Sequence, residues 1–330
     1  MSVKQIIEEI EQEVIDVNKT TFVHNPTSSV PSITDSGLTY ESGTDKKGKK
    51  IETCVLFVDI RNSVALTEKH HNQTMGRVYT AFTKAILKLA RHHNGHTRNI
   101  IGDRVMIVFP SKNCFKNAVH CAISINHASE KLINKHFAVD FKCGIGIHYG
   151  ELRVIKVGIQ RNGSENGENK GLVWVGYPAN LASRLTDVAN KKMENDYFEV
   201  TRHPINPKAI KPLFGGLASM FGNTSNYDPN APFYLNTTEI VEMSVTEFAD
   251  SIHHYDDGRL FTGGGKNIKF KKKTKTHTFP PILMTETVFK GYKKEAPKAN
   301  DVVNNWWIEQ EYPIDNIKEK VYGKHLTWKI

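Results

Sequence analysis

Short apolar runs and longer amphipathic stretches alternate along most of this chain. The run Cys54–Val58 is apolar at nearly every position and stops at Asp59, which predicts a short buried strand that ends at a carboxylate. A second apolar segment, Ile100–Phe109, is interrupted by Gly102 and Asp103, two residue types that tolerate the positive backbone angles of a tight hairpin. We therefore expect two strands joined by a Gly-Asp turn.

Helical stripes of apolar residues separate and follow these strands. One stripe consists of Met75, Val78, Phe82, Ile86 and Leu89, and the next of Ala118, Cys121, Ala122, Ile125 and Leu132. Further strands are expected over residues 139–148 and 151–157, and Trp174–Leu185 indicates a strand, a turn and a helix with Pro178 in its first turn. Strands and helices in this alternation predict an α/β sandwich, with helices packed on a mixed sheet.

The beginning of the chain differs from this pattern. Residues 2–17 have apolar positions spaced for one face of an amphipathic helix. Residues 20–50 are rich in Ser, Thr, Pro, Gly and Lys and show no clear periodicity, which predicts a linker or irregular arm. We therefore divide the chain into an N-terminal helix and arm over residues 1–50 and one domain over residues 51–330.

Asp59 and Asp103 are candidates for metal-assisted chemistry. If their strands are neighbours in one sheet, both carboxylates lie at the same end, where two divalent cations about 3.5 to 4 Å apart could activate a phosphate ester. An Asp after an apolar strand is also often a turn former or a helix cap. For either Asp alone both readings stand, and residues further along the chain favour the chemical one.

Asn180 and Arg184 lie four residues apart in the predicted helix. That spacing places an amide and a guanidinium on one face. There they could donate hydrogen bonds to a ribose oxygen and to a phosphate that gains negative charge. Surface helices often carry such pairs, so this pair gains meaning only together with the two carboxylates.

Four motifs, in this order, resemble the catalytic domain of class III nucleotidyl cyclases, the adenylyl and guanylyl cyclase family. They are Phe57-Val58-Asp59-Ile60, Gly102-Asp103, Gly144-Ile145-Gly146-Ile147-His148-Tyr149-Gly150-Glu151 and Ala179-Asn180-Leu181-Ala182-Ser183-Arg184. Together they are far more specific than any one alone. The resemblance implies the class III cyclase catalytic fold and its reaction, in which a ribose 3′-hydroxyl attacks the α-phosphate of a nucleoside triphosphate and pyrophosphate leaves.

The resemblance also implies a metal site. Asp59, Asp103 and the backbone carbonyl of Ile60 would hold two divalent cations, Mn²⁺ or Mg²⁺. Phe57, in the same motif as Asp59, would lie at the nucleotide.

The last two motifs would supply the remainder of the site. By the same resemblance Asn180 and Arg184 would stabilise the transition state, and the site would form between the two subunits of a homodimer. His148 could be a catalytic histidine, but the sequence favours a partly buried histidine whose hydrogen bonds are satisfied by the backbone.

Base recognition is where this sequence departs from better-known relatives. Adenylyl cyclases usually read the purine with a Lys four residues before the second metal Asp and an Asp or Thr seven before the catalytic Asn, and guanylyl cyclases place Glu and Cys there. Here those positions hold Asn99 and Val173. Val173 cannot hydrogen-bond a base, whereas Asn99 can donate or accept. The long side chains of Arg98 and Arg104 could fill the space that a purine's second ring needs.

These departures, with the segment Ile51–Ser63, are similar to the bacterial pyrimidine cyclases of the Pycsar antiphage system. That resemblance implies UTP, or else CTP, as the substrate and a cyclic pyrimidine nucleotide as a second messenger. A separate effector gated by this product would act downstream. A purine cyclase with atypical base recognition and a cyclase-like module that binds nucleotide without turnover remain open alternatives.

The family pattern also predicts an insertion and a further phosphate ligand. Family domains continue from the helix of Arg184 almost directly to a strand and helix like those expected at residues 281–289, so residues from about 202 to 278 would form an insertion within the domain. Residues 306–312 and 320–328 resemble the closing strands. Lys324 would then contact the triphosphate, unless it is a solvated lysine at the sheet edge.

Composition limits the remaining classes. The 330 residues are 39% hydrophobic, and no stretch approaches the roughly 18 apolar residues of a membrane span, which predicts a cytoplasmic protein without membrane insertion. The 4 cysteines lack Cys-x-x-Cys spacing, so we expect reduced core thiols. The net charge of +9 is concentrated in a lysine run between Lys266 and Lys275, which favours a solvated loop or hairpin edge over specific nucleic-acid binding.

Overall fold

The computed structural model describes residues 2–40, 45–161, 164–210, 227–254, 260–314 and 316–330. The chain forms two compact units. The first consists of Met1–Lys191 and Thr278–Ile330, and the second of Lys192–His277. The second unit is continuous in sequence and interrupts the first, and its residues 211–226 and 255–259 lie outside the described part of the chain.

The first unit contains a nine-stranded sheet, whose main path runs β13-β14-β12-β5-β2-β4-β3, while β1 pairs with β2 and β6 with β5. The strands are β1 (Thr21–Pro26), β2 (Asp45–Ile60), β3 (His96–Ile101), β4 (Arg104–Val108), β5 (Cys143–Arg161), β6 (Ser164–Val175), β12 (Ile282–Thr285), β13 (Ile308–Glu309) and β14 (Val321–Lys324). Strand β12 is parallel to β5, whereas β2 is antiparallel to it. The predicted mixed sheet is therefore confirmed.

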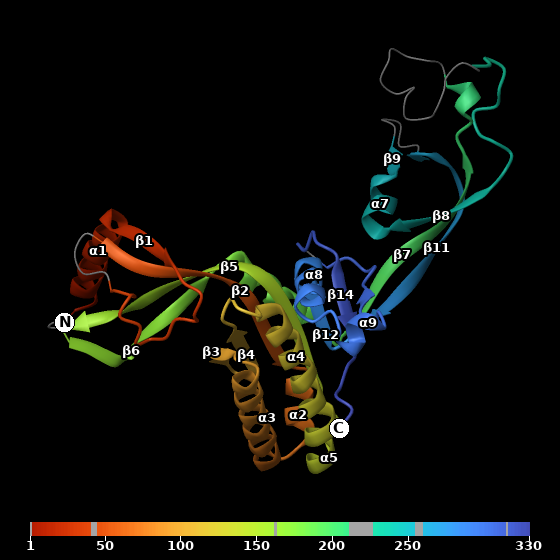
Figure 1. Ribbon diagram of the computed structural model, residues 1–330. Helices are drawn as coiled ribbons and strands as arrows, with labels where there is room; N and C mark the ends of the chain where they lie inside the picture. Colours follow the sequence, from red (N-terminus) through yellow and green to blue (C-terminus); the bar gives the residue numbers. More distant parts are fainter. Residues whose placement is uncertain (1, 41–44, 162–163, 211–226, 255–259, 315) are drawn as a thin grey trace. The chain divides into compact units, whose positions relative to one another are not determined.

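Helices cover both faces of this sheet (Figure 1). The helices of the first unit are α1 (Val3–Lys19), α2 (Ser63–Lys69), α3 (Asn72–His92), α4 (Cys114–His127), a π-helical turn (Ala128–Ile133), α5 (Asn134–Phe137), α6 (Tyr177–Val188), α8 (Glu286–Glu295) and α9 (Asn300–Val303). Helices α3, α4 and α8 pack on one face of the sheet and α6 packs on the other, whereas α1 buries none of its residues. Alternate residues of β2 separate the faces. Cys54, Leu56 and Val58 pack with α3, α4 and α8, whereas Ile51 and Val55 pack with α6.

Most predicted core positions are buried, and Leu132 is an exception. The stripe residues of α3 and α4 lie in the main core with 9% exposure or less, apart from Leu89, which is partly buried against it. Leu132 is 50% exposed. The π-helical turn Ala128–Ile133 takes more residues per turn than an α-helix, so it changes the phase of the stripe that the sequence extrapolates.

Two strands are longer than the sequence predicts. Strand β2 begins at Asp45, and its first residues pair in parallel with β1, so the prediction of an irregular arm over residues 20–50 was wrong at both ends. Strand β5 is continuous through Gly150, where two strands were expected. In both cases a neighbouring strand, β1 beside β2 and β6 beside β5, forms the backbone hydrogen bonds. Such pairing leaves no apolar pattern in the sequence.

The second unit contains a three-stranded sheet of β11 (Gly265–Thr278), β7 (Lys192–Pro204) and β8 (Glu239–Ser244), in that order. It also has a 3₁₀ turn (Pro207–Ala209), α7 (Val245–Asp250), and a pair of short strands, β9 (Ile252–His254) and β10 (Leu260–Thr262). The lysine run lies on the edge strand β11. Lys272 pairs with Asp196 at 2.6 Å and Lys273 with Glu199. The run therefore lies on a sheet edge, and carboxylates of the neighbouring strand β7 partly neutralise it.

All four cysteines are free and buried, as predicted. Burial raises the pKa of Cys143 to about 12, so this thiol stays protonated at neutral pH. Among the described residues, no helix has the length and apolarity needed to cross a membrane.

Candidate active site

The two candidate metal carboxylates lie at one edge of the sheet. Gly102, with a φ of 61°, and Asp103 form the turn of the β3–β4 hairpin, in which Ile101 pairs with Arg104. Strand β4 is antiparallel to β2, with Val58 opposite Val105. The end of β2 at Asp59 therefore lies beside the start of β4, and the predicted hairpin and strand neighbourhood are confirmed.

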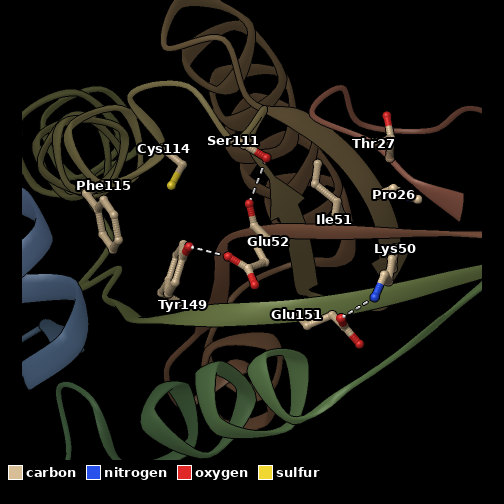
Figure 2. Close-up of a pocket in the computed structure, with 10 residues that line it drawn as sticks. All are labelled: Pro26, Thr27, Lys50, Ile51, Glu52, Ser111, Cys114, Phe115, Tyr149 and Glu151. Atoms are coloured by element: carbon tan, nitrogen blue, oxygen red, sulfur yellow. Dashed lines mark hydrogen bonds and ion pairs between the residues drawn. The ribbon is translucent and has the colours of Figure 1, made fainter.

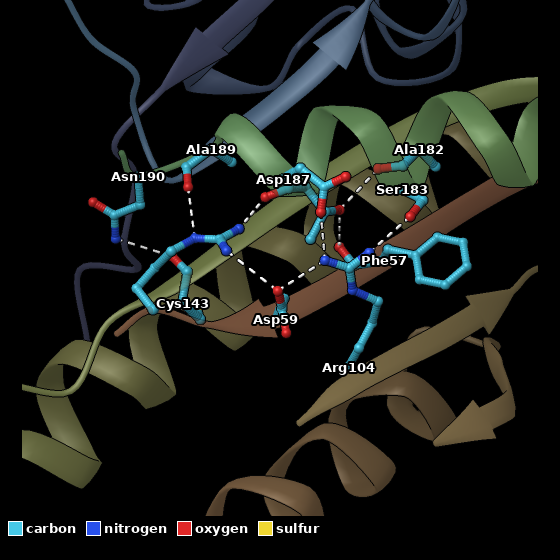
Figure 3. Close-up of polar contacts among 11 residues, drawn as sticks. Phe57, Asp59, Arg104, Cys143, Ala182, Ser183, Asp187, Ala189 and Asn190 are labelled. Carbon is cyan, nitrogen blue, oxygen red and sulfur yellow. Dashed lines mark hydrogen bonds and ion pairs between the residues drawn. The ribbon is translucent and has the colours of Figure 1, made fainter. Parts of the chain in front are cut away.

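Asp59 is surrounded by positive charge. Its side chain is 14% exposed. Its Oδ2 atom accepts hydrogen bonds from Arg104 Nη2 at 2.9 Å and from Arg61 Nη1 at 3.3 Å (Figure 3). Both guanidiniums therefore act on one oxygen of this carboxylate, which holds the carboxylate in a single orientation.

Arg61 is anchored by the C-terminal end of α6. Its guanidinium donates to the carbonyl oxygens of Ala189, at 2.8 Å, and Thr186. These carbonyls belong to the last turn, where they lack partners within the helix. The Arg61 side chain is only 4% exposed, and burial lowers the pKa of Arg61 from its ordinary value. The glycine-rich motif makes this contact possible, since a Cβ at Gly144 would collide with the Arg61 guanidinium.

Arg104 connects Asp59 to α6. Its Nη1 atom donates to Ser183 Oγ at 2.8 Å, and its Nη2 atom donates to Asp187 as well as to Asp59. Burial opposes the charge, but the hydrogen bonds to the two carboxylates raise the pKa of Arg104 above its ordinary value. Arg104 was expected to fill space beside the base; the structure shows it bound to the candidate metal ligand Asp59 and to α6 instead.

Asn180, Arg184 and Asp187 form the outward stripe of α6. All three are exposed, whereas the intervening apolar residues face the sheet. The predicted helix and its proline are confirmed, and the spacing does place Asn180 and Arg184 on one face. Asp187 is bound to Arg104 of the same chain, whereas Asn180 and Arg184 lie on the solvent-exposed part of this face.

The candidate base-reading residues lie on two neighbouring regions of the sheet. Asn99 is exposed on β3, and Val173 is 40% exposed on β6. Arg98 is the extra residue of a β-bulge between Thr97 and Asn99. Its guanidinium lies 6.0 Å from the ring of Trp174. The structure thus brings Arg98 next to the residue that follows Val173.

Phe57 and Lys324 have different surroundings. Phe57 is partly buried with Trp174 on the face of the sheet that carries α6, and its carbonyl accepts a hydrogen bond from Thr186 at 3.1 Å. Lys324 is partly exposed in β14. Tyr322, two residues earlier, stacks on Phe289 of α8, so Lys324 lies on the α8 face by alternation. Asp59 lies on the α6 face with Phe57, so one chain does not bring Lys324 to Asp59.

The donor atoms at this edge suit a hard divalent cation. Among the described residues, neither Asp59 Oδ1 nor the Asp103 carboxylate takes part in a hydrogen bond or ion pair. With the carbonyl of Ile60 they offer oxygen ligands of the kind that Mg²⁺ and Mn²⁺ bind. No cluster of three or more His, Cys, Asp or Glu occurs in the described part of the chain. Substrate phosphates and water would therefore complete the coordination.

Sequence reasoning missed four residues of this network: Arg61, Ser183, Asp187 and Trp174. Their side chains contact residues that lie far away in the sequence, and no local motif distinguishes them. Only Arg61 could have been singled out, because it directly follows the Phe-x-Asp-Ile motif.

His148 has the structural role that was expected of it. Its side chain is 4% exposed, and its Nδ1 atom shares a hydrogen bond of 2.9 Å with the Thr285 hydroxyl. Burial lowers the pKa of His148, with an opposing effect from Glu319 at 3.8 Å. The neutral imidazole is thus held by β12, although by a side chain rather than by backbone.

A separate pocket of about 330 Å³ lies near the start of α4 (Figure 2). Its charged groups are partnered with one another. Lys50 pairs with Glu151 at 3.3 Å, and Tyr149 donates to Glu52 at 3.1 Å. Burial, together with the hydrogen bond and charge of Glu52, raises the pKa of Tyr149 to about 12. This pocket contains none of the candidate site residues.

Comparison with known proteins identifies the family of this chain. Residues 46–193 match the family model for the adenylate and guanylate cyclase catalytic domain. A uridylate cyclase of Burkholderia cepacia is 32% identical over 171 residues, which cover 50% of this chain and 70% of that protein. A uridylate cyclase of Gulbenkiania mobilis is 25% identical over 201 residues, which cover 54% of this chain and 76% of that protein.

Among solved structures, the guanylyl cyclase Cya2 is 13% identical, with a TM-score of 0.45 and coverage of 84% of this chain and 92% of that chain. The family match spans Asp59, Asp103, Asn180 and Arg184, the residues on which the resemblance of the sequence depends. The chain therefore belongs to the adenylate and guanylate cyclase catalytic domain family, and it is a nucleotidyl cyclase.

Proposed function

We propose that this enzyme converts UTP to 3′,5′-cyclic UMP and pyrophosphate. The observation that carries the proposal is the pair of carboxylates, Asp59 and Asp103, at one edge of the sheet, each with an oxygen that has no partner among the described residues. The relatives named uridylate cyclases support UTP as the nucleotide. CTP is the second candidate, because both pyrimidines lack the second ring of a purine.

In this reaction the 3′-hydroxyl oxygen of the ribose bonds to the α-phosphorus, and the bond from that phosphorus to the oxygen of pyrophosphate breaks. Two divalent cations, Mn²⁺ or Mg²⁺, held by Asp59, Asp103 and the carbonyl of Ile60, would supply acidification of the hydroxyl and neutralisation of the phosphates. Arg61 keeps Asp59 oriented through its other oxygen. Arg184 donates to the phosphate as its charge grows, while Asn180 orients the ribose.

The outward stripe of α6 supports a homodimer with sites between subunits. Asn180 and Arg184 are exposed, whereas Asp59 is largely buried in the sheet edge of the same chain. In a twofold dimer the same surface patch of each subunit forms the interface. The outward stripe of each subunit would then contact the substrate held by the carboxylates of the partner. Lys324, on the other face of the sheet, would either lie outside both active sites or contact the triphosphate bound by the partner.

Base selection in this proposal depends on Asn99, Val173 and Arg98. Asn99 is exposed and can pair with the edge of a pyrimidine. The side chain of Val173 cannot form a hydrogen bond with the edge of a purine base. The guanidinium of Arg98, which lies beside the Trp174 ring, reduces the space available to the base.

The biological part of the proposal rests on the resemblance of the sequence to the bacterial pyrimidine cyclases of the Pycsar system. The cyclic pyrimidine would be a second messenger in antiphage defence, made in the cytoplasm and read by a separate effector gated by the cyclic nucleotide. The second unit, Lys192–His277, begins about ten residues before the insertion expected from about residue 202 to 278, and it is proposed as the part of the domain that is specific to this enzyme. No role in nucleic-acid binding is proposed for the lysine run.

The test compares the wild type with Asp59→Asn and Asp103→Asn, using UTP with Mn²⁺ or Mg²⁺. These changes keep the side-chain shape but remove the negative charge that a cation needs. We expect cyclic UMP formation to fall about 100-fold or more in each variant. The melting temperature should be nearly unchanged for Asp103→Asn and lower for Asp59→Asn, because that change weakens the ion pairs with Arg61 and Arg104. If either variant kept more than a tenth of the wild-type rate, the two-carboxylate chemistry would be wrong.

A further inference from the structure

Arg104 joins two parts of the site that belong to different elements. Its Nη2 atom donates to Asp59 of β2 at 2.9 Å and also to Asp187 of α6, and its Nη1 atom donates to Ser183 Oγ at 2.8 Å. Figure 3 shows Arg104 between the end of β2 and the helix. One side chain therefore connects the metal-binding strand to the helix with the outward stripe.

The partners of Arg104 differ in their surroundings. Asp59 is 14% exposed, whereas Asp187 is 51% exposed. Asp59 also keeps a second guanidinium, because Arg61 contacts the same oxygen. If Arg104 left Asp59, it would retain two contacts on α6, and Asp59 would retain one positive partner. The contact between Arg104 and Asp59 can thus break while both side chains keep other charged or polar partners.

A divalent cation at Asp59 disfavours that contact. The guanidinium and the cation carry the same sign of charge and would lie on one carboxylate, where like charges repel and the surroundings are only partly screened by water. Binding of the cation and the Arg104–Asp59 contact therefore oppose each other.

We propose that Arg104 is a positioning residue that competes with the divalent cation for Asp59, and that Ser183 and Asp187 hold it on α6 when the cation binds. The proposal rests on the metal assignment of the proposed function. It adds a direct connection between cation binding and α6, the helix that carries Asn180 and Arg184. Cation binding at one site thereby changes the contacts of the helix that acts on the substrate.

The competition makes a prediction that a simple structural bridge does not make. Replacing Arg104 with Met removes the competitor, so the cation should bind more tightly. Replacing Ser183 with Ala removes one of the contacts that draw Arg104 away from Asp59, so the cation should bind more weakly. The Ser183→Ala change alters no charge, so a plain electrostatic field at the site cannot account for its effect.

The experiment measures Mn²⁺ affinity of the purified full chain without nucleotide, by electron paramagnetic resonance of the free ion. We expect Arg104→Met to lower the dissociation constant about fivefold, the factor that corresponds to one half-buried ion pair. Ser183→Ala should raise it about threefold, as for one lost hydrogen bond. In the double variant Arg104→Met with Ser183→Ala, the serine change should have no effect.

Asp187→Asn is a second variant with an expected direction, since it should raise the dissociation constant as Ser183→Ala does. A matched control is Arg153→Met, which breaks the exposed ion pair of Arg153 with Glu151 at 3.0 Å and should leave Mn²⁺ affinity unchanged. Melting temperatures establish that each variant is folded.

Four outcomes are decisive. If Arg104→Met and Ser183→Ala changed the affinity in the same direction, or if neither changed it by more than about twofold, Arg104 would be only a structural bridge and the proposal would be overturned. The same holds if Ser183→Ala acted equally in the absence of Arg104. If Asp59→Asn bound Mn²⁺ as the wild type does, the failure would instead lie in the metal assignment of the proposed function.

Discussion

At the scale of single residues, the proposed base recognition depends on exposed positions of strands β3 and β6. Asn99 points to solvent beside the bulge at Arg98, and Val173 lies on the strand of Trp174. Neither residue contributes to the core. Their replacement should therefore change substrate use without changing stability, which separates specificity from folding.

We expect Asn99→Ala to lower kcat/KM for UTP about tenfold, the effect of one hydrogen bond to the base. The melting temperature should stay within about 2 °C of the wild type, because an exposed side chain contributes little to folding. Steady-state kinetics with UTP and a thermal melt measure both. An unchanged kcat/KM would remove Asn99 from the base site.

His93 gives the first unit a sensitivity to acid. Its Nε2 atom shares a hydrogen bond of 2.9 Å with Ser124, and burial, with the nearby His92 and His120, lowers its pKa to about 4. An unfolded chain binds the proton near pH 6.5. The stability that His93 contributes is therefore complete above pH 6.5 and is lost as the pH falls toward 4.

Replacing His93 with Gln, which keeps a nitrogen donor at the same place, should weaken this pH dependence. Between pH 7 and 4.5 the variant should lose about 1 kcal/mol less of its unfolding free energy than the wild type, after allowance for partial exposure. Part of the dependence should remain, because burial also lowers the pKa of His120. Urea unfolding at several pH values provides the measurement, and equal slopes for the two proteins would contradict the account.

Residues whose role depends on strand ends could be predicted, and residues whose role depends on tertiary contacts could not. Asp59 and Asp103 were found because each interrupts an apolar run. Arg61 and Arg104 act through α6, more than seventy residues further along the chain, and no periodic pattern relates such distant positions.

At the scale of elements, close contact between β5 and α6 places the outward stripe relative to the sheet. The backbone of α6 approaches Gly146 so closely that a Cβ there would lie 2.5 Å from Thr186 N and still closer to the carbonyl oxygen of Ala182. These neighbours are backbone atoms, which cannot move without moving the helix.

Gly146→Ala should therefore lower the unfolding free energy by about 1–3 kcal/mol, as expected for overpacking, and should reduce activity by displacing Asn180 and Arg184. Gly171→Ala in β6 is the matched control, because a Cβ there meets no atom within 4 Å. Denaturant unfolding and cyclase rates compare the two variants. Equal stability in both would mean that the packing of α6 on β5 does not need this glycine.

The sequence predicted elements well where one face is apolar and poorly where the chain is paired outside the core. Helices α3, α4 and α6 were found from periodicity and a proline. The polar beginning of β2 and the second half of β5 were not, because their partners β1 and β6 supply hydrogen bonds without an apolar stripe.

At the scale of the whole molecule, the second unit interrupts the first without breaking its fold. The chain leaves the first unit after Lys191 and returns at Thr278, and Phe279 N donates to the Lys191 carbonyl at 2.9 Å. The two ends are thus close enough for a short turn to join them.

Replacing residues 192–277 with a short Gly-Ser turn should leave the first unit folded, with a cooperative thermal transition. Its cyclase rate should stay within about tenfold of the full chain, because the carboxylates and the outward stripe belong to the first unit. Circular dichroism and product formation test this. If the shortened protein were unfolded, the second unit would be needed for the first to fold.

The proposed dimer predicts complementation between inactive variants. Asp103→Ala lacks a carboxylate, and Arg184→Ala lacks the stripe residue. When the two are mixed in equal amounts, half of the dimers are mixed and each has one intact site, so about a quarter of the wild-type rate should return. No recovery after subunit exchange, with both variants folded and dimeric, would place the complete site within one chain.

The central claim is that this enzyme cyclises a pyrimidine nucleotide, and one competition measurement tests it most directly. The purified protein is incubated with equal concentrations of ATP, GTP, CTP and UTP, with Mn²⁺ and separately with Mg²⁺, and cyclic products are identified by mass spectrometry against Asp103→Ala. The account predicts cyclic UMP as the main product and none from the variant. A cyclic purine as the main product would contradict the assignment of Asn99 and Val173, and the absence of any cyclic product would contradict the proposed reaction itself.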